Sequence, residues 1–409
     1  MDEMVVNVMK SIVFIGTYKF GTSKEALTIA KEMGYAVILF TDKHSHLDLL
    51  EVDTVIFIEN LLNEQHVMSE ILVLQKIGKQ ICTCVSFIDP YVSYAARLST
   101  LLGLKVVSFQ PLSLMENKIT LRETLKHLPI TPAYWIIRPE DPLQNLKCKS
   151  HLPLIVKAPV SNGSKDVLMV KTTTKLTKVI HNLRDKYPNS SLLIEEFLEG
   201  PQYLIELVIQ NDELKFMEVM EQDVIYNGKF IVGAYKYPAI LEETLYKSLI
   251  FHISTVMGEL GFSNGSCHME MKLAQNEWML IEINPRMSGG VMNQIIEEGT
   301  GINLLKEILN IYLGEEPEFT KTRSKYVNAR YITIQSRGRL LKVKGKERAL
   351  EHEGVKYVYI KPVVGAVLKK PHSMGDRYAC IIAVSESEGQ AEEIALCAAK
   401  EIKFYLEPF

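Results

Sequence analysis

Two carboxylates and one amide stand on two short stretches of sequence that have the pattern of neighbouring β-strands. Polar and apolar residues alternate over residues 268–273 and again over residues 279–284, and these stretches contain Glu270, Glu282 and Asn284. Alternation with a period of two places the polar residues of a strand on one face. Carboxylate and amide oxygens suit Mg²⁺, which in proteins usually bridges carboxylates and nucleotide phosphates. We therefore predict that these three residues bind Mg²⁺ (or Mn²⁺) and that the protein uses ATP.

The length of the turn between the two strands decides whether Glu270 and Glu282 can share a metal ion. A three-residue turn at residues 275–277 sets them opposite each other, whereas a slip of one residue would move them to opposite faces. Alternating acids can also form an amphipathic hairpin with one solvated face. Apolar residues on both sides of Glu282 argue against that alternative, because a buried carboxylate is costly unless it binds a cation.

The composition is that of a globular protein with two or three domains. The chain has 409 residues and a net charge of −3, so its charge gives no argument for nucleic acid or an anionic membrane as a partner. No apolar run approaches the roughly 20 residues that span a bilayer. Cys82 and Cys84 lie in an apolar strand, without the further Cys or His pairs that zinc requires. We expect a reduced, cytoplasmic protein.

Residues 1–112 alternate apolar strands with helices, which is typical of a doubly wound parallel sheet in an α/β domain. The loop at residues 16–21 could hold phosphate, but a plain strand-to-helix turn is the better interpretation, because the third glycine of a dinucleotide motif is absent. Ligands of such sheets bind at the carboxyl ends of the strands, which makes Asp89 and Tyr91 weak substrate candidates. The expected strands are residues 11–15, 37–41, 54–58 and 80–86, and a fifth that begins at Val106 and Val107.

The rest of the chain has the pattern of two α+β lobes. In residues 113–210 we predict a mainly antiparallel sheet, and in residues 211–409 a lobe that contains the metal site and, from about residue 315, a terminal α+β subdomain. The expected elements of the first lobe are a helix at 113–128 and strands at 154–157, 167–171, 191–197 and 203–209. The expected elements of the second lobe are helices at 241–260 and 300–313. They flank the two strands of residues 268–284 that contain the predicted metal ligands, and we call this pair of strands the metal hairpin.

Two lysines and a loop of small residues precede the metal hairpin and could bind nucleotide phosphates. Lys157 ends an apolar strand, and the loop after it contains Asn162, Gly163 and Ser164. Backbone N–H groups of such a loop can approach phosphate oxygens, and glycine avoids the clash of a Cβ atom. Lys118 lies on the predicted helix. Taken singly, the loop also fits an ordinary hairpin, and Lys118 a solvated surface residue.

An apolar strand that turns sharply at Gly200 and Pro201 could hold an adenine base. The carboxylate of Glu195 in this strand could accept a hydrogen bond from the adenine amino group. The turn exposes main-chain groups that could bind the edge of the base.

These pieces, taken in order, resemble the ATP-grasp superfamily over about residues 10–310. The resemblance implies the ATP-grasp fold, with the N-terminal domain described above, a central lobe, a C-terminal lobe and ATP between the lobes. It implies that both lysines and the loop contact the ATP phosphates and that the strand end at 195–198 holds adenine. Where many members have an acidic residue for the ribose, this chain has Gln202. The matching pieces are Lys118, Lys157, residues 161–167, residues 195–198, and Glu270 with Glu282-x-Asn284-Pro285-Arg286.

The expected chemistry joins anions, so cations must offset their repulsion. Arg286 directly follows the metal strand and could form a bidentate contact with a carboxylate or phosphate. In the family an arginine there lies near the acyl phosphate, although a surface salt bridge is the alternative. His268 faces the same way as Glu270 and is either a catalytic contact or a structural histidine. We expect backbone N–H groups of residues Ser288, Gly289 and Gly290 to lie beside the substrate.

Within the superfamily, the run at residues 282–290 looks closest to L-amino acid ligases. Such enzymes join an amino acid carboxylate to an amine and release ADP and phosphate, so the resemblance implies small-molecule carboxylate and amine substrates. Dimers are common in the family, which makes a homodimer possible. The alternatives are a biotin-carboxylase-like or purine-pathway enzyme that uses bicarbonate, and a ligase that loads an amino acid onto a carrier-protein thiol. A non-catalytic ATP-binding protein is disfavoured because the motif residues occur together.

Overall fold

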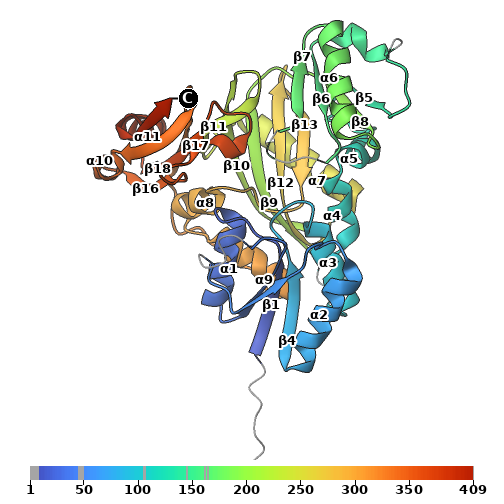
Figure 1. Cartoon of the computed structure of the whole chain (residues 1–409), viewed down its shortest axis with the longest axis vertical. Helices are drawn as coiled ribbons and strands as arrows, with labels where there is room; N and C mark the ends of the chain where they lie inside the picture. The colour runs from blue at the N-terminus through green and yellow to red at the C-terminus, as the bar shows by residue number, and fades with distance from the viewer. Residues whose placement is uncertain are drawn as a thin grey trace, which may run out of the picture.

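The computed structural model describes residues 9–44, 50–104, 107–143, 146–160, 163 and 165–408. Figure 1 shows the N-terminal domain below, the central lobe above it, and a long sheet that runs between them toward the C-terminal subdomain at the side. The arrangement confirms the ATP-grasp layout that the sequence predicts. Among the described residues, no helix is long and apolar enough to cross a membrane.

The N-terminal domain is a parallel sheet in the order β3-β2-β1-β4. Four of the five predicted strands are confirmed. The fifth is wrong in its described part, because Val107 leads directly into a helix at Phe109; Val106 lies outside the described residues. The strands are β1 (Met9–Ile15), β2 (Ala36–Thr41), β3 (Thr54–Phe57) and β4 (Lys79–Val85), and the helices are α1 (Thr22–Glu32), α2 (Glu64–Lys76) and α3 (Val92–Leu101).

The central lobe is an antiparallel sheet in the order β5-β8-β6-β7, covered by one helix. The single helix expected at residues 113–128 is wrong: two helices meet at Asn117, which has an extended backbone. Its side chain accepts hydrogen bonds from the N–H groups of Ile119 and Thr120 and so caps the second helix. The elements are α4 (Phe109–Glu116), α5 (Lys118–Leu125), β5 (Tyr134–Ile137), β6 (Leu154–Lys157), β7 (Val167–Val170), α6 (Thr173–Lys186) and β8 (Leu192–Glu196).

The large sheet has the order β13-β12-β9-β10-β11-β14-β18-β16. Its strand β9 directly follows the central lobe, so the expected boundary at residue 210 falls inside the β9–β10 hairpin. Strands after residue 315 extend the same sheet. The strands are β9 (Gln202–Gln210), β10 (Glu213–Tyr226), β11 (Phe230–Tyr237), β12 (Gly265–Ala274), β13 (Glu277–Asn284), β14 (Tyr326–Ile332), β16 (Val355–Ile360) and β18 (Ala379–Ser385), and the helices are α7 (Glu243–Leu260), α8 (Met292–Thr300), α9 (Leu304–Leu313) and α11 (Gln390–Glu401).

A smaller sheet completes the C-terminal subdomain. Its strand order is β17-β15-β19, and the helix α10 and a short 3₁₀ helix lie in the connections. The bounds are β15 (Gly338–Lys344), α10 (Lys346–Glu351), β17 (Val367–Leu368), the 3₁₀ helix (Met374–Asp376) and β19 (Lys403–Pro408).

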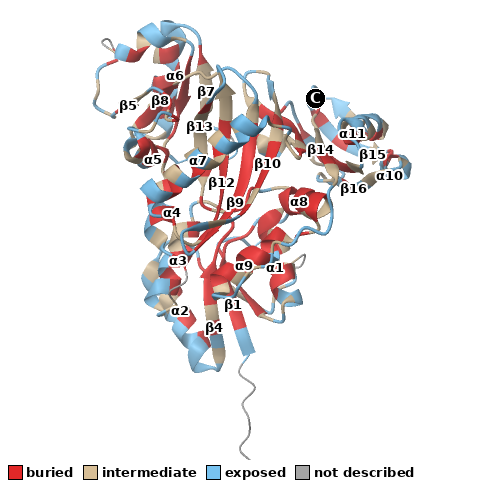
Figure 2. Cartoon of the chain, turned by 180° about the vertical axis from the view of Figure 1, so that it is seen from behind, coloured by how far each residue is buried: buried red, intermediate tan, exposed pale blue. Residues whose placement is uncertain are grey.

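The main hydrophobic core joins the N-terminal domain to the large sheet. Phe14 of β1, Ile308 of α9 and Met269 of β12 belong to one cluster of buried residues. Figure 2 shows β9 and β12 buried along most of their length, while the outer faces of the helices are exposed. Strands β12 and β13 of the metal hairpin contribute buried residues to this core, which holds their backbone in place.

Trp278 anchors that hairpin. Its side chain is 1% exposed. The indole N–H donates to the carbonyl of Leu245 in α7 at 3.0 Å, and the ring meets Tyr203 edge to face at a centroid distance of 5.2 Å. The residue thus ties β13 to both α7 and β9.

We expect Trp278→Ala to lower the free energy of unfolding by about 3–5 kcal/mol, because it empties a large buried site and orphans the Leu245 carbonyl. Urea denaturation measures the change. The other tryptophan, Trp135, is only half-buried, so Trp135→Ala serves as the control and should cost clearly less. Equal losses in the two variants would contradict the anchoring role of Trp278.

Candidate active site

The register of the metal hairpin is set by a bulge. The turn has two residues, Gln275 and Asn276, both with positive φ, as in a type I′ hairpin. The expected three-residue turn is therefore wrong, and a regular two-residue hairpin would pair Glu270 with Ile281. The register shifts by one residue after Glu270, so that Glu270 lies opposite Glu282 as predicted. Glu277 is not in the turn but begins β13.

Arg122 stabilises the bulge from the neighbouring helix. Its Nη2 atom donates to the carbonyl oxygens of Leu280 and Ile281 at 2.9 and 2.6 Å. A bulge leaves backbone groups without partners in the ladder, and the guanidinium supplies partners for these two carbonyls. The side chain is 1% exposed. The sequence reasoning missed this residue.

The same guanidinium holds the buried carboxylate of Glu195. Its Nε atom lies 2.5 Å from Glu195 Oε1, and Lys157 Nζ contacts the other carboxylate oxygen. Burial opposes ionisation of Glu195, but the charges of Arg122 and Lys157 outweigh it and hold the pKa of the carboxyl below its ordinary range. Glu195 therefore positions Lys157, which differs from the expected contact with the adenine amino group.

Glu270 and Glu282 face each other with unequal surroundings. Lys118 Nζ lies 3.4 Å from Glu282 Oε2. Gln202 and Gln222 each donate to Glu270 at 3.3 Å. Burial and then the Glu282 charge raise the pKa of Glu270, whereas burial of Glu282 is outweighed by the cations of Lys118 and Lys157, which lower its pKa. Gln202, expected near a ribose, thus donates to a carboxylate of the predicted metal site.

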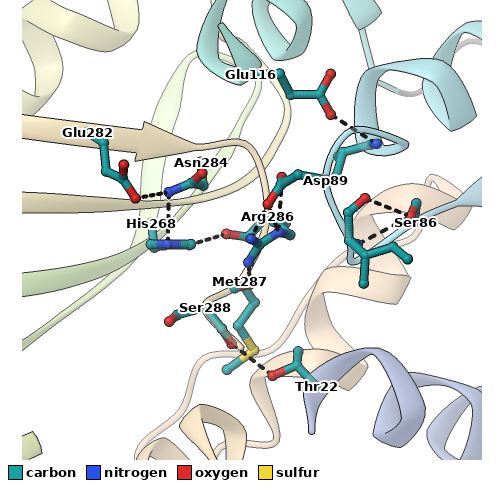
Figure 3. Close-up of polar contacts among 12 residues, drawn as sticks. Thr22, Ser86, Asp89, Glu116, His268, Glu282, Asn284, Arg286, Met287 and Ser288 are labelled. Atoms are coloured by element: carbon teal, nitrogen blue, oxygen red, sulfur yellow. Dashed lines mark hydrogen bonds and ion pairs between the residues drawn. The ribbon is translucent and has the colours of Figure 1, made fainter. Parts of the chain in front are cut away.

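Asn284 is oriented by a chain of hydrogen bonds that Figure 3 shows. His268 Nδ1 lies 2.7 Å from the carbonyl oxygen of Arg286, which can only accept, so this nitrogen carries the proton. His268 Nε2 then accepts from Asn284 Nδ2 at 3.2 Å, and the same amide group donates to Glu282 at 3.1 Å. The amide oxygen is left for a cation. Burial and then the Arg286 charge lower the pKa of His268 to about 4, so it is a neutral orienting group.

Arg286 and the turn after it connect the hairpin to the N-terminal domain. Arg286 Nε lies 3.2 and 3.1 Å from the two carboxylate oxygens of Asp89. Ser288 donates its N–H to Glu206 at 2.8 Å. The carbonyl of Ser288 accepts from Thr22 Oγ1 at 2.8 Å (Figure 3). The Ser288 N–H is therefore used inside the protein, contrary to the expected contact with substrate.

A cleft of about 780 Å³ opens between the central lobe and the metal hairpin. Its residues come from β6, β7 and β8 on one side and from β12 and β13 on the other. Apolar surfaces alternate with cations and carboxylates along it. The lining residues are Lys118, Pro132, Ile155, Lys157, Gly163, Val167, Glu195, Glu196, Phe197, Leu198, Gln202, Phe230, Glu270, Lys272, Leu280, Ile281 and Glu282.

The strand end at residues 195–198 forms the inner wall of this cleft. Glu196 exchanges hydrogen bonds with Ala133 through both its N–H and its side chain. The carbonyl of Leu198 accepts from Lys272 Nζ at 2.9 Å. Gly200 lets the chain turn closely, because a Cβ atom there would lie 2.1 Å from the carbonyl oxygen of Leu273.

Most of the predicted site residues thus lie together. Lys118, Lys157, Gly163, Glu195, Glu196, Leu198, Gln202, Glu270 and Glu282 all line the cleft. Next to the carboxylates of this cleft lie Asn284, His268 and Arg286. They are followed along the chain by the turn that contains Gly289 and Gly290. Asn162 and Ser164 lie outside the described residues. Arg122, Asp89, Gln222 and Glu206 join the site from other elements.

The donor set and the cleft fit Mg²⁺ and a nucleotide. Two carboxylates in register and one amide oxygen are hard ligands, and a divalent cation would remove the repulsion that raises the pKa of Glu270. Lys118 and Lys157 supply positive charge for phosphates at the same end.

Comparison with known proteins agrees with this geometry. Residues 150–295 match the ATP-grasp domain, and residues 330–407 match the L-amino acid ligase C-terminal domain 2. Residues 150–295 are therefore an ATP-grasp domain. This match covers both the phosphate-binding side of the cleft and the metal hairpin, and the second match covers the C-terminal subdomain.

Individual proteins are similar to this chain at low identity. It is 25% identical to the protein y4rH of Sinorhizobium fredii over 300 residues, 72% of this chain and 62% of that protein. It is 24% identical to dapdiamide A synthase of Enterobacter agglomerans over 169 residues, 40% of each chain. The chain thus spans less than two thirds of the length of these relatives. The structure of an L-amino acid ligase from Bacillus licheniformis superimposes with a TM-score of 0.85 at 20% identity, over 98% of this chain and 100% of that one.

We expect Arg122→Met to lower the free energy of unfolding by about 3–5 kcal/mol, because it leaves the buried Glu195 carboxylate and two carbonyls without their partner. Arg122→Lys keeps the charge but lacks the fork of donors and should recover part of the loss. Urea denaturation measures both. Lys126→Met removes an exposed cation one turn further along the chain and should change stability by less than about 0.5 kcal/mol. A small effect of Arg122→Met would contradict the proposed support of the bulge.

Glu206 gives a pH-dependent prediction. Burial raises the pKa of Glu206 to about 8, although the hydrogen bond from Ser288 opposes the shift. The folded state therefore holds a proton that the unfolded chain releases near pH 4.5. The contribution of Glu206 to the free energy of unfolding is fully present below about pH 4.5, and it is lost as the pH rises toward 8.

Glu206→Gln should remove this dependence. Relative to the wild type, the variant should gain stability between pH 5 and 8, by up to about 1.4 kcal/mol for each pH unit. Urea unfolding at several pH values measures the slope. The exposed Glu277→Gln should follow the wild-type profile, and parallel profiles of Glu206→Gln and wild type would refute the assignment.

Proposed function

We propose that this protein is an ATP-dependent carboxylate–amine ligase that activates an amino acid as an acyl phosphate and transfers it to an amine. The observation that carries the proposal is the pair Glu270 and Glu282, held in register at the end of a cleft that also contains Lys118 and Lys157. Carboxylates placed there to hold a divalent cation, beside cations that bind phosphate, form a site for phosphoryl transfer.

The side chains around the cleft would offset the negative charge of the ATP phosphates and of the acyl phosphate during the reaction. Bound at Glu270, Glu282 and Asn284, Mg²⁺ would neutralise the phosphates and favour attack on the γ-phosphorus. Lys157, fixed by Glu195, and Lys118 would bind phosphate oxygens without a large reorganisation. Arg286 lies at the exit of the metal strand, where a fork of N–H donors suits an acyl phosphate or the tetrahedral species formed by amine attack.

Two further facts support an amino acid as the acid. The C-terminal subdomain matches the L-amino acid ligase family model. A relative from Bacillus subtilis, 22% identical over 237 residues, is named L-arginine-specific L-amino acid ligase. No residue of the described site favours bicarbonate, so the carboxylase alternative gains no support from it.

The proposal predicts phosphate release from ATP and Mg²⁺ that depends on amino acids, tested singly and in pairs. With hydroxylamine in place of the amine, the activated acid should give a hydroxamate. Glu282→Gln should reduce the turnover by roughly 100-fold or more, because it removes a metal ligand. Chelation of the metal should have the same effect, and product masses identify the bond that forms.

Glu277→Gln provides the matched control, since it changes an exposed acid of the same strand and should leave the rate unaltered. Absence of phosphate release with every pair, or an undiminished rate in Glu282→Gln, would overturn the proposal. ATP turnover that requires bicarbonate would instead favour the carboxylase alternative.

A further inference from the structure

Arg377 is a rigidly held cation at the far end of the active-site face. It follows the 3₁₀ helix Met374–Asp376, and its guanidinium lies 3.6 Å from the ring centre of Tyr331. Its Nε atom donates to the carbonyl of Met374 at 3.2 Å, and Nη1 donates to the carbonyl of Val232 at 3.4 Å. A stacking ring and two carbonyls therefore fix the orientation of the group.

Within the described part of the chain, no carboxylate forms an ion pair with Arg377. The neighbouring Asp376 accepts instead from the N–H groups of His372 and Ser373. By contrast, Arg122 and Arg286 both pair with carboxylates. A half-buried cation without a counter-charge is costly, and an anion that binds from outside recovers part of that cost.

A row of neighbouring side chains connects Glu270, at the predicted metal site, with Arg377. Gln222 donates to Glu270, and Tyr235 lies opposite Gln222 on the adjacent strand. The ring of Tyr235 meets that of Tyr331 edge to face at a centroid distance of 6.1 Å, and Arg377 stacks on Tyr331. Because paired residues share a face of a sheet, Arg377 lies over the same face as the metal site.

On its other side, Arg377 faces the turn after Arg286. Gly290 has a φ of +84°, and a Cβ atom there would lie 3.0 Å from Tyr331 Oη and 3.9 Å from Arg377 Nη2. A Cβ atom on Gly289 would meet nothing within 4 Å. The glycines thus keep side chains away from one edge of the guanidinium.

Lys361 adds positive charge to this region. Its ammonium group donates to the carbonyl of Gly375, within the 3₁₀ helix that precedes Arg377. Burial and then the charges of Arg377 and, more weakly, Lys19 lower the pKa of Lys361, and Asp376 opposes the shift.

We propose that Arg377 forms a subsite that binds a second carboxylate of the substrates, separate from the carboxylate that is activated. The inference rests on the proposed ligase function. The guanidinium edge suits a bidentate contact with a carboxylate, and Lys361 strengthens the local attraction for an anion. The second carboxylate belongs either to the accepting amino acid or to an acid substrate with two carboxylates.

Carboxamide analogues distinguish the two sources. For the acceptor, the active amino acid is compared with its amide, for example L-alanine with L-alaninamide. For the donor, aspartate and glutamate are compared with asparagine and glutamine. In the wild type, one of these two comparisons should show a preference of roughly tenfold or more in kcat/KM for the carboxylate, as expected for a charged hydrogen bond.

Arg377→Met should abolish that preference, mainly through KM, while the neutral analogue reacts as before. Arg377→Lys should retain part of the preference, which separates loss of charge from loss of structure. Arg339→Gln, an exposed arginine of the same subdomain, is the matched control and should keep the preference. Thermal unfolding confirms that the variants fold.

Equal losses for the carboxylate and its amide in Arg377→Met would overturn the subsite while leaving the ligase function intact. Absence of any amino-acid-dependent turnover in the wild type would overturn the function, and binding then decides the subsite alone. Isothermal titration of the wild type with succinate should show binding that Arg377→Met loses and Arg339→Gln keeps. No binding to the wild type, or equal binding to Arg377→Met, would refute the inference.

Discussion

The guanidinium of Arg122 joins parts of the site that meet only in the folded chain. It binds the carbonyls at the β13 bulge and the carboxylate of Glu195, which in turn fixes Lys157. The bulge places Glu282 opposite Glu270. The carboxylate of Glu195 fixes the position of the Lys157 ammonium group. One buried side chain therefore determines the relative position of the proposed metal ligands and of the lysine proposed to bind phosphate.

The distribution of charge around this centre follows from burial. Cations and carboxylates that lie within the cleft hold one another in fixed geometries, so they lose little entropy when a ligand binds. Arg286 with Asp89 and Arg122 with Glu195 are balanced pairs. Arg377 differs, because carbonyls and an aromatic ring hold it and no described carboxylate pairs with it.

Several elements could be predicted because their signal is local. The strands of the N-terminal sheet and the residues of the cleft follow from alternation, apolar runs and motif order. The hairpin shows the limit of such reasoning: its pairing of Glu270 with Glu282 was predicted from a three-residue turn, yet a two-residue turn and a bulge produce it. Arg122 was missed, although its position four residues after Lys118 places both on one helix face and could have indicated a shared role.

The sequence by itself determined which chemistry the chain can perform, since ligand types and their spacing along a strand are local properties. Tertiary structure alone decided the partners of those groups. Glu195 binds Arg122 and Lys157, Gln202 supports Glu270, and His268 orients Asn284. The physical reason is that a buried polar group takes the partner that packing brings within reach, and residues far apart in sequence meet only when the lobes and the large sheet close around the cleft.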